Sequence, residues 1–222
     1  GRDHGALVDT ARMPTWRLVV ANQNHDQVGN RARGDRLAEH LDDDQLACAA
    51  LLTMAGPFTP MLFMGEEWAA STPFAFFTSH PEEDLGRATA EGRIAEFEQM
   101  GWDPDVVLDP QDPDTFRRSR LDWDELSQGR HAVLLECYRR LGRLRRELPQ
   151  LTDPAFGSVS CWVEGRLFTM RRDDVLVVVN AGEVEATVDV DEDCEVLFQT
   201  PSGVVLDDGA LTVPAHGGAL LR

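Results

Sequence analysis

The sequence predicts an α/β segment over residues 1–150 followed by a small antiparallel β domain over residues 151–222. Two short apolar runs, 18–21 and 61–64, each end in polar residues and flank an apolar helical run. That pattern is typical of a β-α-β unit with parallel strands. After residue 152 the sequence alternates in strand fashion between turn signals, which indicates antiparallel hairpins.

The composition limits the classes of ligand. The chain has 222 residues, a formal net charge of −18 and 42% hydrophobic residues. Nucleic acid and anionic membranes are therefore not expected as partners. A neutral sugar or polyol is neither attracted nor repelled by the negative charge of the chain. No stretch approaches the length of a membrane span. The four scattered cysteines form no metal-binding or redox motif and predict reduced structural thiols in a cytoplasmic protein.

The first apolar run predicts a short buried strand because Val19 and Val20 are β-branched. The polar residues that follow it are Asn24, His25, Asp26 and Gln27. Crowding polar groups at the end of a strand costs desolvation, which favours a ligand-binding role. A turn that caps the next helix explains the same residues equally well, so both interpretations stay open.

The second apolar run, residues 61–64, predicts another strand, which breaks at Gly65 into Glu66, Glu67 and Trp68. The two strand ends should lie on one face of a parallel sheet, where ligands bind. Glu67 and Trp68 then line a substrate groove, with the indole as a platform for a sugar ring. The alternative is a buried tryptophan beside a capping or salt-bridged glutamate pair.

The remaining elements are predicted from the spacing of apolar residues and from the Gly and Pro residues that interrupt it. Residues 68–126 predict a long, aromatic-rich functional loop with one short helix near 92–102. Residues 129–148 predict the clearest helix, ended by Pro149, with arginines on a solvated face. Its apolar stripe consists of Leu134, Cys137, Leu141, Leu144 and Leu148. The β domain has turn signals at 164–165, 173–174 and 181–182, and residues 209–222 predict one final strand.

Four stretches of the chain carry a family resemblance: QNHDQVGNRARGDRL, PMLFMGEEWAASTPFAFFTSH, GRIAEFEQMGW and TFRRSRLDW. In this order they resemble the α-amylase superfamily of glycoside hydrolases, and within it the trehalose-releasing branch. In the (β/α)8 barrels of that superfamily the seventh strand ends in Asn-His-Asp, matched here by residues 24–26. The resemblance implies the last two strands and helices of a TIM barrel, followed by a small β-sandwich domain.

The same resemblance implies retaining hydrolysis of the α-1,4-glucosidic bond next to the trehalose end of a malto-oligosyltrehalose, which releases trehalose. Asp26 would be the third catalytic carboxylate, which stabilises an oxocarbenium-like transition state, and His25 would contact the same sugar ring. Asn24, Gln27, Glu67 and Trp68 would belong to the substrate-binding wall. No cofactor is expected, and no hard-cation loop pattern predicts a metal site.

The resemblance also implies that essential parts lie outside this sequence. In the superfamily the nucleophile and the acid/base come from the fourth and fifth strands, whereas the match here begins at the seventh. The chain is therefore expected to be an inactive fragment with exposed strand edges and low stability. Two alternatives stay open: another α-glucan enzyme, such as an amylase or a branching enzyme, and a non-catalytic carbohydrate-binding protein. A branching enzyme is disfavoured because its seventh strand is expected to end in Ser-His-Asp. The sequence does not determine the oligomeric state.

Overall fold

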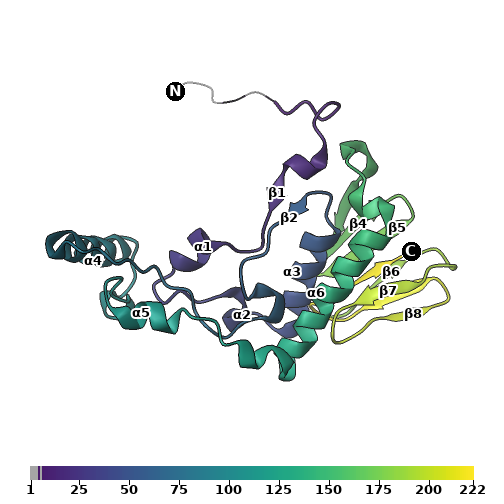
Figure 1. Ribbon diagram of the computed structural model, residues 1–222. Coiled ribbons are helices and arrows are strands. Elements are labelled where there is room, and N and C mark those ends of the chain that lie inside the picture. The colour runs from purple at the N-terminus through teal and green to yellow at the C-terminus, as the bar shows by residue number, and fades with distance from the viewer. Residues whose placement is uncertain (1–4, 6) are drawn as a thin grey trace. The chain divides into compact units, whose positions relative to one another are not determined.

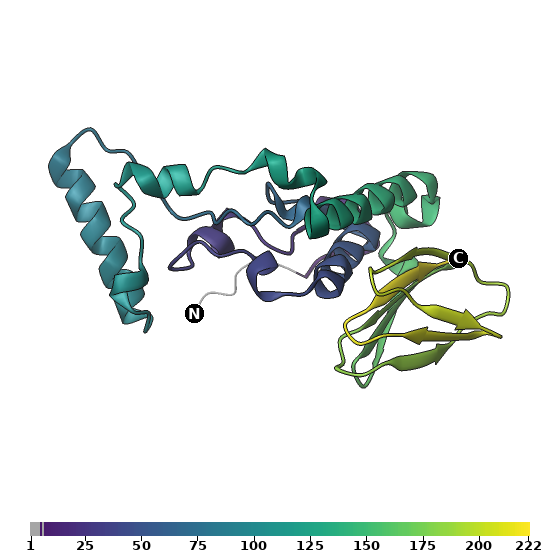
Figure 2. The same ribbon diagram turned by 90° about the horizontal axis from the view of Figure 1, so that it is seen from below.

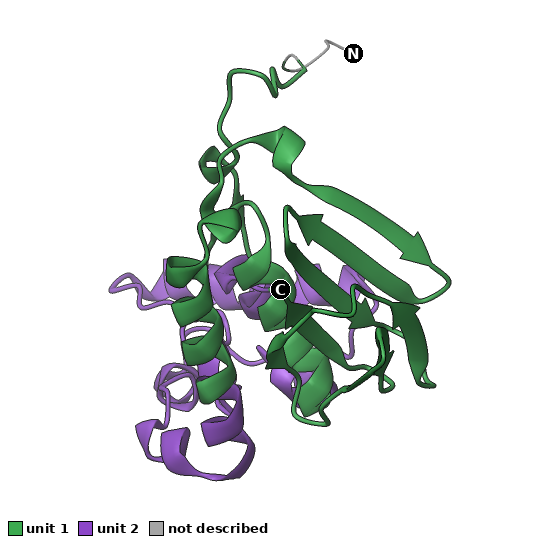
Figure 3. Cartoon of the chain, turned by 90° about the vertical axis from the view of Figure 1, so that its right-hand side faces the viewer, with its two compact units in different colours: residues 1–22, 42–61, 136–222 green, residues 23–41, 62–135 purple. Residues whose placement is uncertain are grey.

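The computed structural model describes residue 5 and residues 7–222, and it divides into two compact units (Figure 3). Unit 1 comprises Gly1–Asn22, Asp42–Met61 and Glu136–Arg222, and unit 2 comprises Gln23–Leu41 and Leu62–Leu135. The units follow spatial contacts rather than chain order. The predicted domain boundary at residue 150 stays a prediction.

The α-helices and some of the strands are labelled in Figure 1. The α-helices are α1 (His25–Gly29), α2 (Leu37–His40), α3 (Asp43–Ala55), α4 (Glu83–Gln99), α5 (Pro113–Arg118) and α6 (Gly129–Glu147). The short 3-10 helices are η1 (Thr15–Arg17), η2 (Glu66–Trp68), η3 (Pro104–Val106), η4 (Trp123–Ser127), η5 (Pro149–Thr152) and η6 (Phe156–Ser158). The strands are β1 (Val19–Val20), β2 (Thr59–Pro60), β3 (Ser160–Glu164), β4 (Leu167–Arg172), β5 (Val175–Asn180), β6 (Ala186–Asp189), β7 (Val196–Gln199), β8 (Val205–Asp207), β9 (Ala210–Val213) and β10 (Gly218–Leu221).

The predicted parallel pair is present in unit 1, but it is shorter than expected. β1 pairs with β2 in parallel, with Val19 opposite Thr59. The prediction of a strand at 61–64 is wrong: Met61 still donates its amide to the Val20 carbonyl, and the chain then leaves the sheet. The prediction that β1 is buried is also wrong, because Val19 is 59% exposed. Among the described residues β1 has β2 as its one neighbour, so the opposite edge is left open.

The antiparallel strands predicted after residue 152 are confirmed as two sheets, with strand orders β3-β4-β5-β10-β7 and β6-β9-β8 (Figure 2). All six residues of β5 are buried because both faces of this strand are covered. Val177 packs in a core with α3 and α6, and Val178 packs in a second core with Leu211 of the other sheet. The final segment holds two strands rather than one, because a turn at 214–217 separates β9 from β10.

The predicted apolar stripe of α6 is confirmed: Leu134, Leu141, Leu144 and Leu148 are buried, and Cys137 is half-buried. Its arginines are not all on a solvated face, however. Arg145 donates to three carbonyls in the last turn of α3 and just after it, namely those of Met54 (2.6 Å), Gly56 (2.8 Å) and Phe58 (2.7 Å). A helix leaves its last carbonyls without intrahelical partners, and a cation there also complements the helix dipole.

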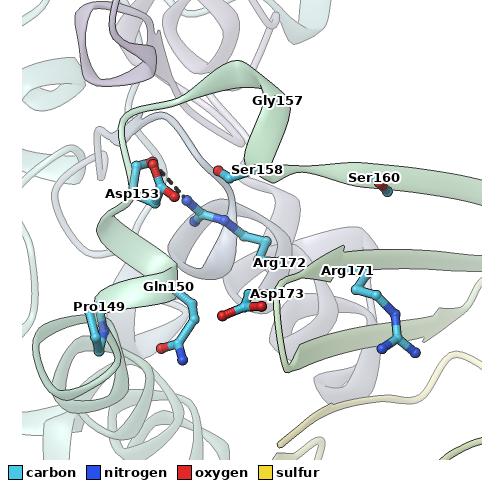
Figure 4. Close-up of a pocket in the computed structure, with 9 residues that line it drawn as sticks. All are labelled: Pro149, Gln150, Asp153, Gly157, Ser158, Ser160, Arg171, Arg172 and Asp173. Atoms are coloured by element: carbon cyan, nitrogen blue, oxygen red, sulfur yellow. Dashed lines mark hydrogen bonds between the residues drawn. The ribbon is translucent and has the colours of Figure 1, made fainter.

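Arg172 of β4 also donates to carbonyls at the end of α3. Its side chain is 1% exposed and donates to the carbonyls of Ala55 (3.2 Å), Gly56 (3.3 Å), Leu151 (2.9 Å) and Asp153 (3.1 Å). Burial, together with the nearby charge of Arg145, lowers the pKa of Arg172 to about 10. Arg172 is also one of the residues that line an open pocket of about 690 Å³, and Figure 4 shows these lining residues. The arginine therefore ties α3 to β4 through main-chain oxygens.

Residues 68–126 contain more helix than predicted. The short helix expected near 92–102 is a 17-residue helix, α4, and α5 follows it. α4 is rich in Glu, Ala and Arg, which favour helix, but only Gly86 and Phe97 are buried. Because so few of its residues are buried, α4 has weak apolar periodicity in the sequence. The predicted helix was therefore too short.

Two further observations bear on the class of protein. Among the residues that the structure describes, no helix has the length and apolar character needed to cross a membrane. All four cysteines are free, and Cys48 is buried. Burial raises the pKa of the Cys48 thiol to about 12, which keeps it protonated and unreactive.

We expect Arg172→Leu to lower the free energy of unfolding by about 3 kcal/mol, because several buried carbonyls lose their donor. Urea unfolding followed by circular dichroism measures this change. Arg171→Leu is the matched control: the Arg171 side chain is 45% exposed and lies 3.9 Å from Asp191, so the change should stay within about 0.5 kcal/mol. Equal effects of the two substitutions would contradict the role given to Arg172.

His216 makes unit 1 sensitive to pH. Its Nδ1 lies 2.7 Å from Asp42 at the start of α3, and its Nε2 lies 3.4 Å from Glu183. The hydrogen bond to Asp42, then that to Glu183, raises the pKa of His216 above its usual 6.5. The protonated form therefore stabilises the fold below about pH 6.5, and this contribution is lost as the pH rises through the raised pKa.

We accordingly expect the melting temperature to fall between about pH 6 and pH 8.5, and His216→Asn to flatten this dependence. Asparagine suits the site because residue 216 has φ of 59°. Thermal melts at both pH values measure the effect, with His80→Asn as the control. The same slope in His216→Asn and in the unsubstituted chain would disprove the assignment.

Candidate active site

The Asn24-His25-Asp26 motif lies at the start of α1, directly after β1 in the chain. Asn24 has extended backbone angles, and its Oδ1 accepts from the amides of Asp26 (2.9 Å) and Gln27 (3.1 Å). This is an N-cap, which satisfies two amides that the helix itself leaves free. The capping interpretation is therefore correct for Asn24, whose side-chain oxygen is occupied by the main chain.

The three residues that follow Asn24 face solvent. The side chains of His25 and Asp26 are 72% and 73% exposed, and His25 Nε2 lies 3.2 Å from Asp26 Oδ1. Gln27 is exposed as well. The cap thus fixes the backbone of the first turn while a carboxylate, an imidazole and an amide remain available to a ligand.

The residues after the motif are tied down by ionic contacts within unit 2. The carboxylate of Asp35 accepts from Arg31 and lies 2.6 Å from His40 Nε2. Burial alone would raise the pKa of Asp35, but the hydrogen bonds from His40 and Arg31 outweigh it and hold the pKa below its usual range. Asp35 therefore stays ionised and anchors both partners.

The second motif, Met64 to Trp68, forms a tight turn around Gly65. Gly65 has φ of +87°, and a Cβ there would lie 2.8 Å from the side chains of Ala70 and Leu121, so no other residue fits. Glu66 is buried and accepts from the amide of Phe63 at 2.9 Å. Glu67 is half-buried, and its Oε2 is buried without a hydrogen-bond partner.

Arg36 organises this turn, and pattern reasoning missed it. Its side chain is 3% exposed, and it donates to the carbonyls of Met64 (2.8 Å) and Thr72 (2.5 Å). Burial lowers the pKa of Arg36, while the charges of Glu66, Glu67 and Glu125 oppose that shift. The spacing of Arg36 from the second motif in sequence gave no signal of this contact.

Trp68 is 2% exposed, so its ring has no free face on which a sugar could stack. Its Nε1 donates to Glu125 Oε1 at 3.4 Å, and its ring packs 5.0 Å from that of Trp123. Glu125 also accepts from the amide (3.1 Å) and hydroxyl (2.8 Å) of Ser71. The structure gives Trp68 the buried position that was the alternative interpretation.

The site therefore offers one exposed carboxylate, Asp26, with its neighbouring imidazole. Within the described part of the chain, no hydrogen bond or ion pair joins His25 or Asp26 to Glu67 or Trp68. Likewise, no cluster of three or more His, Cys, Asp or Glu residues suited to a metal ion occurs among the described residues. A carboxylate and an imidazole without a metal can bind sugar hydroxyls and stabilise a developing cation.

Comparisons with known proteins agree with this chemistry. No family model matches the chain. The chain is 53% identical to malto-oligosyltrehalose trehalohydrolase of Brevibacterium helvolum, over 100% of this chain and 38% of the relative. It is 42% identical to the protein of the same name from Mycobacterium tuberculosis H37Rv, again over 100% of this chain and 38% of the relative. The chain thus spans about two fifths of the length of these relatives.

Solved structures give the same fold. A crystal structure of a candidate alpha amylase from Salmonella typhimurium matches with a TM-score of 0.79 and 30% identity, over 95% of this chain and 36% of that protein. The trehalose-6-phosphate hydrolase of Bacillus licheniformis matches with a TM-score of 0.57 and 15% identity, over 91% of this chain and 42% of that protein, which shows the fold alone.

Fold and sequence therefore relate this chain to the α-amylase class of glycoside hydrolases. Within that class, it is homologous over its whole length to the malto-oligosyltrehalose trehalohydrolases.

We expect Glu125→Leu to destabilise unit 2 by about 2–4 kcal/mol, because Trp68 and Ser71 lose their buried acceptor. The tryptophan emission should shift to longer wavelength at lower urea concentrations than in the unsubstituted chain. Glu125→Gln keeps an acceptor oxygen and should cost less. Asp124→Asn, at the exposed neighbouring position, is the control, and an effect as large as that of Glu125→Leu would contradict the assignment.

Proposed function

We propose that this chain forms the part of a trehalose-releasing glycoside hydrolase that carries its transition-state-stabilising carboxylate. The substrate is a malto-oligosyltrehalose, and the bond cleaved is the α-1,4-glucosidic bond next to the trehalose end. The observation that carries the proposal is the 53% identity over the whole chain to a protein of that name, combined with an exposed Asp26 on a capped helix. Trehalose release proceeds with retention at the anomeric carbon.

Asp26 and His25 act on the sugar at the cleaved bond. The transition state is an oxocarbenium-like cation, so a fixed carboxylate beside the ring stabilises the charge that develops there. The His25 imidazole lies 3.2 Å from Asp26 and donates to a ring hydroxyl, which orients the same sugar. Contacts of this kind that tighten in the transition state contribute several kcal/mol.

Of the other predicted site residues, some would contact the substrate and others would support the residues that do. Gln27 extends the exposed polar wall beside Asp26, and Asn24 acts through the cap that orients the first turn. Glu67 contributes to the substrate-binding wall from the Gly65 turn, where its Oε2 has no hydrogen-bond partner, while Trp68 supports that turn from inside unit 2. A neutral glucan fits this wall in spite of the chain's charge of −18.

The nucleophile and the acid/base are supplied by polypeptide outside this sequence. Retaining hydrolysis needs two carboxylates about 5–5.5 Å apart. The relatives are more than twice as long as this chain, which leaves ample polypeptide to supply both. In the same proposal β1 and β2 are the last two strands of a (β/α)8 barrel, and the open edge of β1 receives a further strand. The four free cysteines support a cytoplasmic location.

The test uses the chain alone and a chimera in which it replaces the matching segment of the Brevibacterium helvolum relative. We expect trehalose release from maltotriosyltrehalose by the chimera and none by the chain alone. Asp26→Asn in the chimera should lower kcat by about 10²–10³-fold, because the carboxylate charge is lost while the shape is kept. Asp207→Asn, exposed on β8 of unit 1, is the control and should leave kcat unchanged.

Two results would overturn the proposal. Trehalose release by the chain alone would mean that its own carboxylates suffice for the chemistry. Unchanged kcat in the Asp26→Asn chimera would mean that Asp26 has no part in the transition state.

A further inference from the structure

The position of Asp26 depends on what holds α1, because a helix of five residues cannot hold itself. Isolated helices need about 12–15 residues to be even marginally stable in water. Asn24 secures the amide end of α1. The carbonyl end lies at Gly29 and at the C-cap residue Asn30, whose amide donates to the Asp26 carbonyl at 3.1 Å. Whatever fixes Asn30 therefore also fixes the backbone of Asp26.

Arg93 of α4 makes that contact, from 63 residues further along the chain. Its Nη2 donates to the Asn30 side-chain oxygen at 2.7 Å and to the Gly29 carbonyl at 2.8 Å. Its Nη1 pairs with Glu96 at 3.0 Å, one turn along the same helix. One guanidinium thus bonds the end of α1 and its own helix at the same time.

The guanidinium is itself rigidly held. It lies over two phenyl rings, 4.7 Å from the centroid of Phe76 and 4.6 Å from that of Phe97, and the side chain is only 12% exposed. A planar guanidinium suits both stacking and forked donation, whereas a lysine ammonium does not provide the fork. Its charge also complements the negative end of the α1 dipole.

The burial of α4 agrees with this role. Of its 17 residues only Gly86 and Phe97 are buried, and Phe97 is one of the two rings under Arg93. The rest of α4 contributes little apolar burial. The contact between α4 and α1 therefore runs through the guanidinium and its rings rather than through a broad apolar interface.

We propose that Arg93 is a positioning residue for the hydrolytic reaction: through Asn30 it fixes the turn of α1 that presents Asp26 to the substrate. This inference rests on the proposed function of Asp26. Removing Arg93 releases the carbonyl end of α1 and widens the range of positions that the Asp26 carboxylate visits. A displacement on the order of 1 Å at a catalytic group costs about 10²-fold in rate.

The first experiment measures α1 directly and needs no activity. Hydrogen exchange at the amides of Val28 and Asn30, which bond to Asn24 and Asp26, reports opening of α1 in the chain as it stands. We expect Arg93→Ala to speed this exchange by about 10-fold, since a hydrogen bond to a charged donor is lost, and Arg93→Lys to have a smaller effect. Arg87→Ala is the matched control: it lies on the same helix and pairs at 2.6 Å with Asp84, with a 66% exposed side chain.

The second experiment measures turnover of maltotriosyltrehalose by the chimera described above. We expect Arg93→Ala to lower kcat by about 10–100-fold with KM changed less than about threefold, because the transition state is more sensitive to the position of Asp26 than ground-state binding is. Glu96→Ala, which removes the Glu96 pair but keeps the bonds to α1, should leave kcat unchanged. Asn30→Ala should lower kcat as well. The double variant Arg93→Ala with Asn30→Ala should raise the activation free energy by less than the sum of the two single effects.

The outcomes separate the two levels of inference. Unchanged exchange in Arg93→Ala overturns the positioning role, whatever the activity. Faster exchange with unchanged kcat means that Arg93 holds α1 but that Asp26 is not the catalytic carboxylate, so the proposed function fails instead. If Arg93→Ala and Arg87→Ala change the exchange rate and kcat equally, the cause is general destabilisation of α4. That result would also overturn the proposal.

Discussion

The structure depends on how the carbonyl ends of its helices are satisfied. A helix leaves its last carbonyls without partners, and here arginine side chains from distant segments supply the donors. Arg145 and Arg172 serve the end of α3, Arg130 serves the end of α2, and Arg93 serves the end of α1. All 21 basic residues of the chain are arginine. A forked guanidinium reaches several carbonyls at once, four in the case of Arg172, which an ammonium on a flexible stem does less well.

This arrangement links stability to the candidate site in unit 2. The first turn of α1 is short, solvent-exposed and rich in polar side chains, so it has little apolar burial of its own. Its position is set by the Asn24 cap at one end and by Arg93 at the other. An exposed carboxylate on a backbone held at both ends is suited to act on a neutral sugar, because it remains accessible without becoming mobile.

The candidate site could be predicted from the sequence only in part. Asn24 to Gln27 were recognisable because they are adjacent in the chain and follow a strand, and their exposure agrees with a ligand-binding role. The sequence could not decide between Trp68 as a stacking platform and Trp68 as a buried residue, because an aromatic residue after a strand has the same pattern in both cases. Arg36, Arg93 and Glu125 could not be found in this way, since each bonds to partners that lie 28 to 64 residues away in the chain.

The sequence by itself determined the order and type of most elements. It also determined the motif residues and the resemblance to trehalose-releasing glycoside hydrolases. Local periodicity and caps encode these features, as in the stripe of α6 and the capping box of α3. Only the tertiary structure decided the strand at Thr59–Pro60, the length of α4, the burial of Trp68 and the two layers that cover β5. Those features depend on what packs against each segment, and pairing between distant residues leaves no periodic trace in a single sequence.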